Sequence, residues 1–160
     1  MSKQQTISPA PVKRTVRVKA SPSRAFEVFA AGMGKWWPKR HAIGASPLAD
    51  VIVEPRAGGR FYERGEDGCE CEWGRVIAYE PGKRVALGWQ LDADWRHDPD
   101  FEVEIEVTFK AEGKATLVSL EHRNLERYGE RAEEAAASLG GDSGWTGLLA
   151  SYAEAVSASA

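Results

Sequence analysis

The six tryptophans are the residues with the greatest capacity for specific chemistry in this sequence. An indole ring offers a large rigid contact surface and one N–H donor that orients a ligand. Trp37, Trp73, Trp89 and Trp145 fall in or beside different predicted helices and strands, which we expect to converge on one space. For any single ring, filling the core is the simpler interpretation. For the set, we predict a cavity lined by aromatic side chains.

Three polar residues in phase with apolar neighbours would give such a cavity its specificity. His122 ends a strand with alternating apolar residues, where it would meet a ligand near the cavity mouth or serve as a satisfied core histidine. Arg75 shares a predicted face with Trp73 and would pair with a ligand carboxylate, with a nearby glutamate, or with neither if the strand phase is reversed. Tyr152, on the apolar stripe of the last helix, is a hydroxyl donor with the same alternatives.

Catalytic and cofactor motifs are missing from the sequence, which has no nucleophile elbow, Walker loop or dinucleotide fingerprint. Cys69 and Cys71 are too close for an unstrained disulfide and too few for a zinc site, so we expect free thiols, no metal and no cofactor. The alternating Glu102, Glu104 and Glu106 are typical of a solvent face rather than of a catalytic pair. A binding protein is therefore favoured over an enzyme.

Composition and charge restrict the class of protein further. The 160 residues include no apolar run of the roughly 20 that span a membrane, and Met1 to Val12 has no secretory signal pattern, so we expect a cytoplasmic protein without membrane contact. A net charge of −3 argues against nucleic acid as the partner. Residues 1–64 are basic and the rest acidic, which predicts either mutual pairing or a basic patch for an anionic partner.

Hydrophobic periodicity predicts an α+β domain over residues 12–158, preceded by a flexible tail over residues 1–11. Strands are predicted at 12–20, 51–55, 60–64, 70–79, 83–91, 101–110 and 115–122. Helices are predicted from Ser21-Pro22 to Gly32, over 125–139 and over 144–158. The segment 92–100 is either a lid or a long connection, and its acidity favours a solvated loop.

Strands joined by tight turns are most easily antiparallel neighbours, so the order predicts one sheet of about seven strands. Such a sheet has a face that needs covering, and the last helix is the element long enough to cover it. Its apolar stripe recurs at helical spacing and comprises Trp145, Leu148, Leu149, Tyr152, Ala153 and Val156.

The order and spacing of several segments resemble the START/Bet v 1-like (SRPBCC) superfamily, in the branch of the Hsp90 ATPase activator homologue domain. The resemblance covers roughly residues 12 to 157 and is carried by SPSRAFEVFAA, KWWP, PRAGGRFYERGEDG, GRVIAYEPGKRVALGW, TLVSLEHRNL and GWTGLLASYAEAV. It implies a helix-grip fold, with a curved antiparallel sheet around a long C-terminal helix and two short helices after the first strand. It also implies a cavity for apolar small molecules, while some relatives are polyketide cyclases and some bind Hsp90.

Three functions therefore compete. The first is binding of a hydrophobic small molecule between the sheet and the C-terminal helix by a monomer or homodimer, through Trp37, Phe61, Trp73, Arg75, Trp89, His122, Trp145, Leu149 and Tyr152. The second is an Hsp90-type co-chaperone or stress-response interaction protein, which would use exposed surface. The third is a cyclase-like enzyme that folds a polyketide-like chain, with His122 or Tyr152 as acid or base.

Overall fold

The computed structural model describes residues 10–39 and 41–158, so the predicted tail lies outside the described residues except for Ala10 and Pro11. Within the described residues, seven antiparallel strands form one sheet in the order β1-β7-β6-β5-β4-β3-β2. The strands are β1 (Val12–Val18), β2 (Leu48–Val53), β3 (Arg60–Gly65), β4 (Glu70–Glu80), β5 (Arg84–Trp89), β6 (Val103–Glu112) and β7 (Ala115–Arg123). The predicted antiparallel α+β architecture is confirmed.

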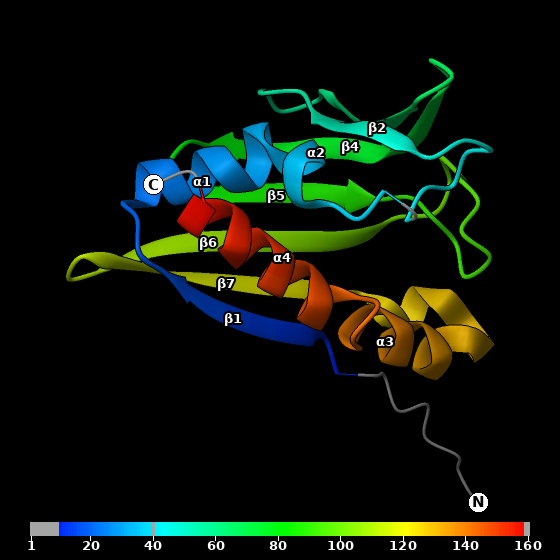
Figure 1. Ribbon diagram of the computed structural model, residues 1–160. Helices are drawn as coiled ribbons and strands as arrows, with labels where there is room; N and C mark the ends of the chain where they lie inside the picture. Colours follow the sequence, from blue (N-terminus) through cyan, green and yellow to red (C-terminus); the bar gives the residue numbers. More distant parts are fainter. Residues whose placement is uncertain (1–9, 40, 159–160) are drawn as a thin grey trace, which may run out of the picture.

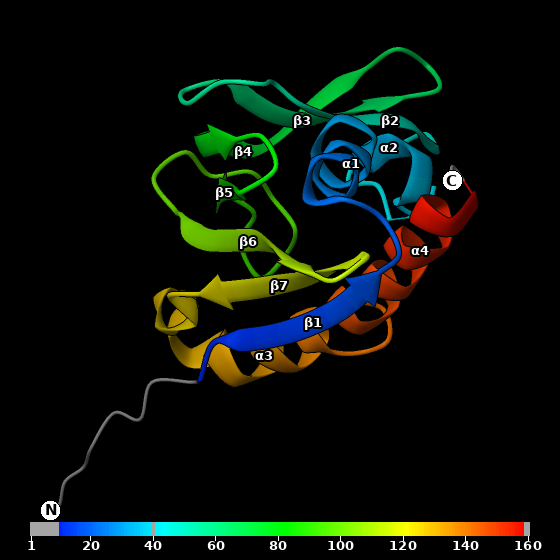
Figure 2. The same ribbon diagram turned by 90° about the vertical axis from the view of Figure 1, so that its left-hand side faces the viewer.

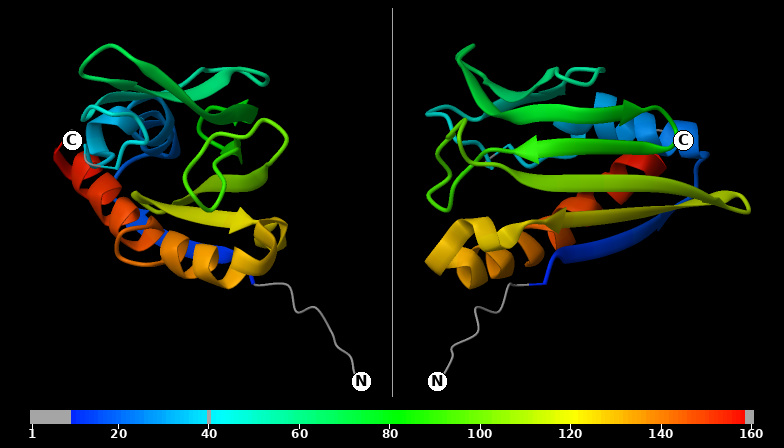
Figure 3. Two further views of the ribbon diagram at one scale, coloured as in Figure 1. Left: turned by 90° about the vertical axis from the view of Figure 1, so that its right-hand side faces the viewer. Right: turned by 180° about the vertical axis from the view of Figure 1, so that it is seen from behind.

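The sheet curls around α4, and the two short helices that follow β1 cover the same concave face (Figures 1 and 2). Seen from behind, the strands lie in front of α1, α2 and α4, so the convex face is the outer one (Figure 3). The helices are α1 (Pro22–Phe26), α2 (Met33–Trp36), α3 (Ala132–Gly140) and α4 (Trp145–Ala158), with a π turn at Glu27–Ala31 and a 3-10 segment at Leu125–Arg131. Among the described helices, none has both the length and the apolar character needed to cross a membrane.

Local sequence accounts for the helix boundaries. Ser21 caps α1 as predicted, because its hydroxyl accepts the N–H of Arg24 at 3.2 Å and Pro22 occupies the first turn.

The prediction of a single helix over 125–139 is wrong in its first half. Gly129 has φ 65° and ψ −129°, which is not helical, so the chain forms a 3-10 segment before α3 begins at Ala132.

The strand phases predicted from alternation are confirmed on β6 and β7. Val103, Ile105, Val107 and Phe109 of β6 are buried, as are Thr116, Val118, Leu120 and His122 of β7. The intervening residues of β6 lie on the outer face, where Glu106 pairs with Arg84 at 3.0 Å, and Glu102, just before β6, pairs with Arg75 at 2.8 Å. These carboxylates form ion pairs and are not a catalytic pair.

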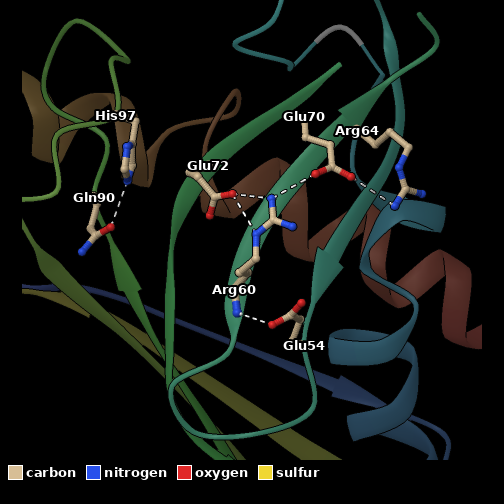
Figure 4. Close-up of polar contacts among 7 residues, drawn as sticks. All are labelled: Glu54, Arg60, Arg64, Glu70, Glu72, Gln90 and His97. Carbon is tan, nitrogen blue, oxygen red and sulfur yellow. Dashed lines mark hydrogen bonds and ion pairs between the residues drawn. The ribbon is translucent and has the colours of Figure 1, made fainter. Parts of the chain in front are cut away.

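Charge pairing across strands also explains the uneven charge of the sequence. Arg60 of β3 lies between Glu70 and Glu72 of β4, and Glu70 also pairs with Arg64 at 3.6 Å (Figure 4). The backbone N–H of Arg60 donates to Glu54 at 2.8 Å (Figure 4). Arginines from the basic first part of the chain thus face glutamates from the acidic second part.

A buried hydrogen bond joins α4 to the sheet. The indole N–H of Trp145 donates to Nδ1 of His122 at 3.0 Å, so the neutral imidazole carries its proton on Nε2. Nε2 is buried and has no hydrogen-bond partner in the described structure. Burial lowers the pKa of His122 from 6.5 to about 3. His122 is therefore a neutral core residue at physiological pH.

Further hydrogen bonds fix the two ends of α4. At its C-terminal half, the hydroxyl of Tyr152 donates to the carbonyl of Ala25 at 2.7 Å and that of Ser151 donates to the carbonyl of Trp36 at 2.6 Å. At its N-terminal end, Arg14 of β1 donates to the hydroxyl of Thr146 at 3.0 Å and to the carbonyl of Gly140 at 2.8 Å. This contact explains why an arginine interrupts the apolar face of β1.

A buried carboxylate, Glu63 of β3, fastens the segment between α2 and β2 to the sheet. Its side chain is 1% exposed. Oε1 accepts the N–H of Ile43 and the indole N–H of Trp73, both at 2.8 Å, and Oε2 accepts the N–H of Gly44 at 3.1 Å. Three N–H donors compensate for the lost hydration of the carboxylate. Glu63 thus sets both the path of the loop and the orientation of the Trp73 ring.

The depressed pKa of His122 makes stability depend on pH. Below about pH 6.5 the unfolded chain takes up a proton on His122, whereas the folded protein does so only near pH 3. We expect the free energy of unfolding to fall by about 2–3 kcal/mol between pH 7 and 4.5 because of this group. In urea unfolding, we expect His122→Asn to have a lower free energy of unfolding than the wild type at pH 7. We also expect this free energy to fall less in the variant than in the wild type on acidification. The control His97→Asn, at an exposed histidine, keeps the wild-type slope; equal slopes in all three proteins would contradict the assignment.

Removal of the Glu63 carboxylate leaves three N–H donors without their acceptor. We expect Glu63→Ala to lower the free energy of unfolding by about 3 kcal/mol, because each orphaned buried donor costs about 1–3 kcal/mol and the loop regains some hydration. Glu66→Ala, at an exposed turn residue nearby, serves as the matched control with a change near zero. Denaturant unfolding at pH 7 measures both, and equal stability of the two variants would contradict the role of Glu63.

Candidate functional site

A pocket of about 510 Å³ lies between the concave face of the sheet and α4. This volume falls in the range of small-molecule sites. The inner wall is aromatic and aliphatic, and it comprises Trp37, Ile43, Trp73, Trp89, Leu91, Leu139, Trp145 and Leu148. Polar groups lie among the remaining lining residues, which are His41, Ala42, Asp94, Trp95, Arg96, Ser138, Ser143 and Gly144.

Four indole rings from four different segments form a continuous aromatic surface. Trp37, just after α2, lies 5.0 Å from Trp73 of β4 and 5.8 Å from Trp145 of α4, measured between ring centroids. Trp73 in turn lies 6.0 Å from Trp89 of β5. The rings are tilted by 50° to 83° to one another, which suits their quadrupoles and excludes a parallel stack.

The polar edges of these rings are mostly engaged within the protein. Trp37 donates its indole N–H to the carbonyl of His41 at 3.2 Å, Trp73 donates to Glu63, and Trp145 donates to His122. The N–H of Trp89 has no acceptor at hydrogen-bonding distance in the described residues, although it lies close enough to the Tyr128 hydroxyl to influence the pKa of that group. The indoles therefore offer mainly apolar ring surface to an occupant.

Charge at the pocket mouth comes from the loop after β5. Asp94 pairs with Arg131 at 2.6 Å, and this hydrogen bond holds the pKa of Asp94 below its usual value. Arg131 also pairs with Glu134 at 2.9 Å, and the hydrogen bonds to Glu134 and Asp94 raise the pKa of Arg131. The guanidinium of Arg96 makes no ion pair within the described ranges. The pocket mouth thus combines the ion-paired carboxylate of Asp94 with the exposed guanidinium of Arg96.

The structure brings four of the predicted site residues to the pocket wall: Trp37, Trp73, Trp89 and Trp145. Their participation in binding remains a prediction. The sequence signal was their aromatic character together with the phase of their strands and helix, which places them on the concave face.

Four other predicted residues are buried behind or beside the pocket. Phe61 packs against Trp73 with centroids 5.3 Å apart, and His122 packs against Trp89 at 5.4 Å. The ring of Tyr152 lies 5.2 Å from that of Phe29, measured between centroids. Its hydroxyl donates to the carbonyl of Ala25, and burial raises its pKa. Leu149 is in the core. These side chains support the wall and are not among the residues lining the pocket.

Arg75 lies on the outer face, contrary to the inward orientation that its spacing from Trp73 predicts. The register between β3 and β4 shifts between Phe61↔Gly74 and Tyr62↔Glu72, which is a β-bulge. The extra residue reverses the phase of β4, so Arg75 points to solvent and pairs with Glu102 through two hydrogen bonds of 2.8 and 3.0 Å. This interaction excludes Arg75 from the pocket.

Sequence reasoning missed the loop residues of the site. Leu91 was in phase with Trp89, and Leu148 was on the helix stripe, so both had a usable signal. Ile43 reaches the wall through its backbone bond to Glu63, which no local pattern indicates. Segment 92–100, favoured as a solvated connection, instead contributes Asp94, Trp95 and Arg96 to the mouth.

Solved structures similar to this chain share its fold over nearly the whole length. An anthrahydroquino-γ-pyrone synthase, Txn09, solved in complex with SUM, is 36% identical with a TM-score of 0.64, over 92% of this chain and 97% of that one. The self-sacrificing resistance protein CalC from Micromonospora echinospora is 31% identical with a TM-score of 0.71, over 94% and 96%. An Aha1 dimer from Colwellia psychrerythraea shares the fold at 17% identity and a TM-score of 0.61, over 92% and 96%.

Comparison with sequences gives the family. None of the curated proteins matches this chain significantly. A family model described as activator of Hsp90 ATPase homolog 1-like protein matches residues 19–157. This match confirms the resemblance seen in the sequence segments, and the helix-grip arrangement of sheet and α4 agrees with it. The chain belongs to the activator of Hsp90 ATPase homolog 1-like family.

Proposed function

We propose that this protein binds a planar, largely apolar aromatic small molecule in the pocket between the sheet and α4. The observation that carries the proposal is the wall of four indole rings around a volume of about 510 Å³. Ring surfaces recognise flat apolar molecules through contact area and quadrupole geometry. Because three of the four indole N–H groups are already hydrogen-bonded inside the protein, recognition by the wall depends on shape.

The orientation of the ligand follows from the distribution of polar groups. The buried end of the pocket is walled by Trp73, Trp89 and Trp145, whereas Arg96 and Ser138 are exposed lining residues. A molecule with an aromatic body and polar substituents at one side would therefore place those substituents toward the mouth, where they remain hydrated.

The relative at 36% identity supports the ligand class. Txn09 is an anthrahydroquino-γ-pyrone synthase and was solved in complex with SUM. CalC is a self-sacrificing resistance protein. At 36% identity over nearly the whole chain, the synthase supports a small-molecule role for the shared fold, and CalC, at 31% identity, shows that the fold also serves a resistance role.

A cyclase-like reaction is the second candidate, and the synthase relative favours it. The acid–base assignment predicted from sequence does not fit, because His122 and Tyr152 are absent from the pocket lining. The Tyr152 hydroxyl is also committed to Ala25. An enzyme at this site would act mainly by holding a reactive chain in a productive shape.

The family description also motivates a co-chaperone role. In that case immobilised protein retains purified Hsp90, and a pocket-filling variant retains it equally because the contact uses the outer surface. Absence of retention would remove this alternative. The free thiols of Cys69 and Cys71 are compatible with a reducing compartment.

Filling the pocket tests the proposed function directly. Ser138 is exposed on α3 and lines the pocket, so Ser138→Trp places a large ring in the ligand space without disturbing the core. We expect isothermal titration calorimetry with emodin, a planar trihydroxyanthraquinone, to show saturable binding that Ser138→Trp weakens by about ten-fold or more, equivalent to at least ~1.4 kcal/mol.

The adjacent Ala137 supplies the matched control. It is exposed on the same helix but does not line the pocket, so Ala137→Trp introduces the same side chain outside the site. Wild-type affinity in Ala137→Trp together with weak binding in Ser138→Trp supports the proposal. Equal affinities in both variants, or no heat of binding to the wild type, would count against it.

A further inference from the structure

Trp95 has a backbone conformation that is unusual for a bulky residue. Its φ is +63°, in the left-handed region that L-residues with large side chains avoid. Among the described residues, the other non-glycine residue with positive φ is Asn124. Asparagine tolerates this region because its short side chain bonds locally, whereas tryptophan has no such compensation. The backbone at Trp95 is therefore strained.

The surrounding turn imposes this conformation. Oδ1 of Asp92 accepts the N–H of Asp94 at 2.9 Å and that of Arg96 at 3.0 Å, so it holds the chain on both sides of Trp95. The N–H of Trp95 donates to the carbonyl of Asp92 at 2.9 Å, and the N–H of Asp92 donates to the carbonyl of Arg96 at 2.9 Å. Arg131 anchors the same turn through Asp94. Together these bonds fix the conformation of the turn, so the unfavourable backbone conformation of Trp95 is maintained in the folded protein.

The strained turn presents an indole to solvent at the pocket mouth. The Trp95 side chain is 47% exposed, the large hydrophobic residue that stands out from the otherwise buried set in the described chain. Its ring meets Trp89 edge-on, with centroids 6.1 Å apart and planes at 79°. The residue lines both the main pocket and a smaller cavity of about 60 Å³ that is also lined by Tyr128 and Ala135. An occupant of the main pocket would cover apolar surface that now faces water.

We propose that Trp95 is a ligand-contacting residue that covers the outer end of an aromatic molecule in the pocket, and that its turn stores backbone strain in order to hold the indole there. The inference rests on the proposed function and names the residue that retains the ligand. The inner indoles receive the body of the molecule, and Trp95 adds a fifth ring on its solvent side. Because its contact with the ligand stabilises the bound state, the loss of this ring is expected to act mainly on the rate of release.

Two substitutions separate the ring from the strain. Trp95→Ala and Trp95→Gly both remove the indole, so stopped-flow release of emodin is expected to accelerate about ten-fold in each. Glycine adopts positive φ freely, whereas alanine does not. We therefore expect Trp95→Gly to melt about 2–4 °C above Trp95→Ala, the reverse of the usual order for these residues. Asp100→Gly, in the same loop but outside the pocket lining, controls for added flexibility.

Each outcome bears on one part of the inference. Faster release in both Trp95 variants, unchanged release in Asp100→Gly and a higher melting temperature for Trp95→Gly support it. Wild-type release from Trp95→Gly, with emodin binding intact and sensitive to Ser138→Trp, overturns the role of Trp95 and leaves the proposed function standing. A melting temperature for Trp95→Ala at or above that of Trp95→Gly overturns the strain. Failure of the wild type to bind emodin overturns the proposed function and this inference with it.

Discussion

The mismatch in length between a single helix and a large concave sheet is the constraint on which the rest of the structure depends. The 14 residues of α4 span about 21 Å, whereas the 11 residues of β4 extend over about 36 Å. A single helix cannot cover such a face from end to end. α1 and α2 cover one end, and bulky side chains must occupy the rest. The indole side chains fill only part of the uncovered concave face, and the volume that they leave empty is the pocket.

The polar groups behind the wall make this incomplete filling stable. An empty pocket flanked by loose rings would collapse, because dispersion contacts are lost across a void. Here Glu63 fixes Trp73 and the loop at Ile43, while His122 fixes Trp145. Neither Glu63 nor His122 lines the pocket, so the rings are oriented by groups that a ligand does not touch. The pocket is thereby preorganised for a rigid molecule.

Regular alternation made much of the fold predictable from sequence. The residues from Val103 to Phe109 in β6 and the stripe of α4 have clear periods of 2 and 3.6, and both lie where those periods place them. The exceptions have physical reasons. The bulge at Trp73 shifts the phase of β4 and turns Arg75 outward, and a bulge depends on pairing with β3 rather than on local sequence. Glu63 is buried because distant N–H groups converge on it.

The order of the strands has a consequence for how the chain folds. β1 lies at one edge of the sheet and pairs with β7, with Val12 opposite His122. The first strand can therefore pair only after most of the chain has been synthesised. Pairing across such a distance in sequence slows folding, because the loop must close before any contact compensates for its entropy. α4 follows later still. During synthesis, the aromatic face therefore stays uncovered until α4 has emerged, and the chain is open to aggregation in the interval between β7 and α4.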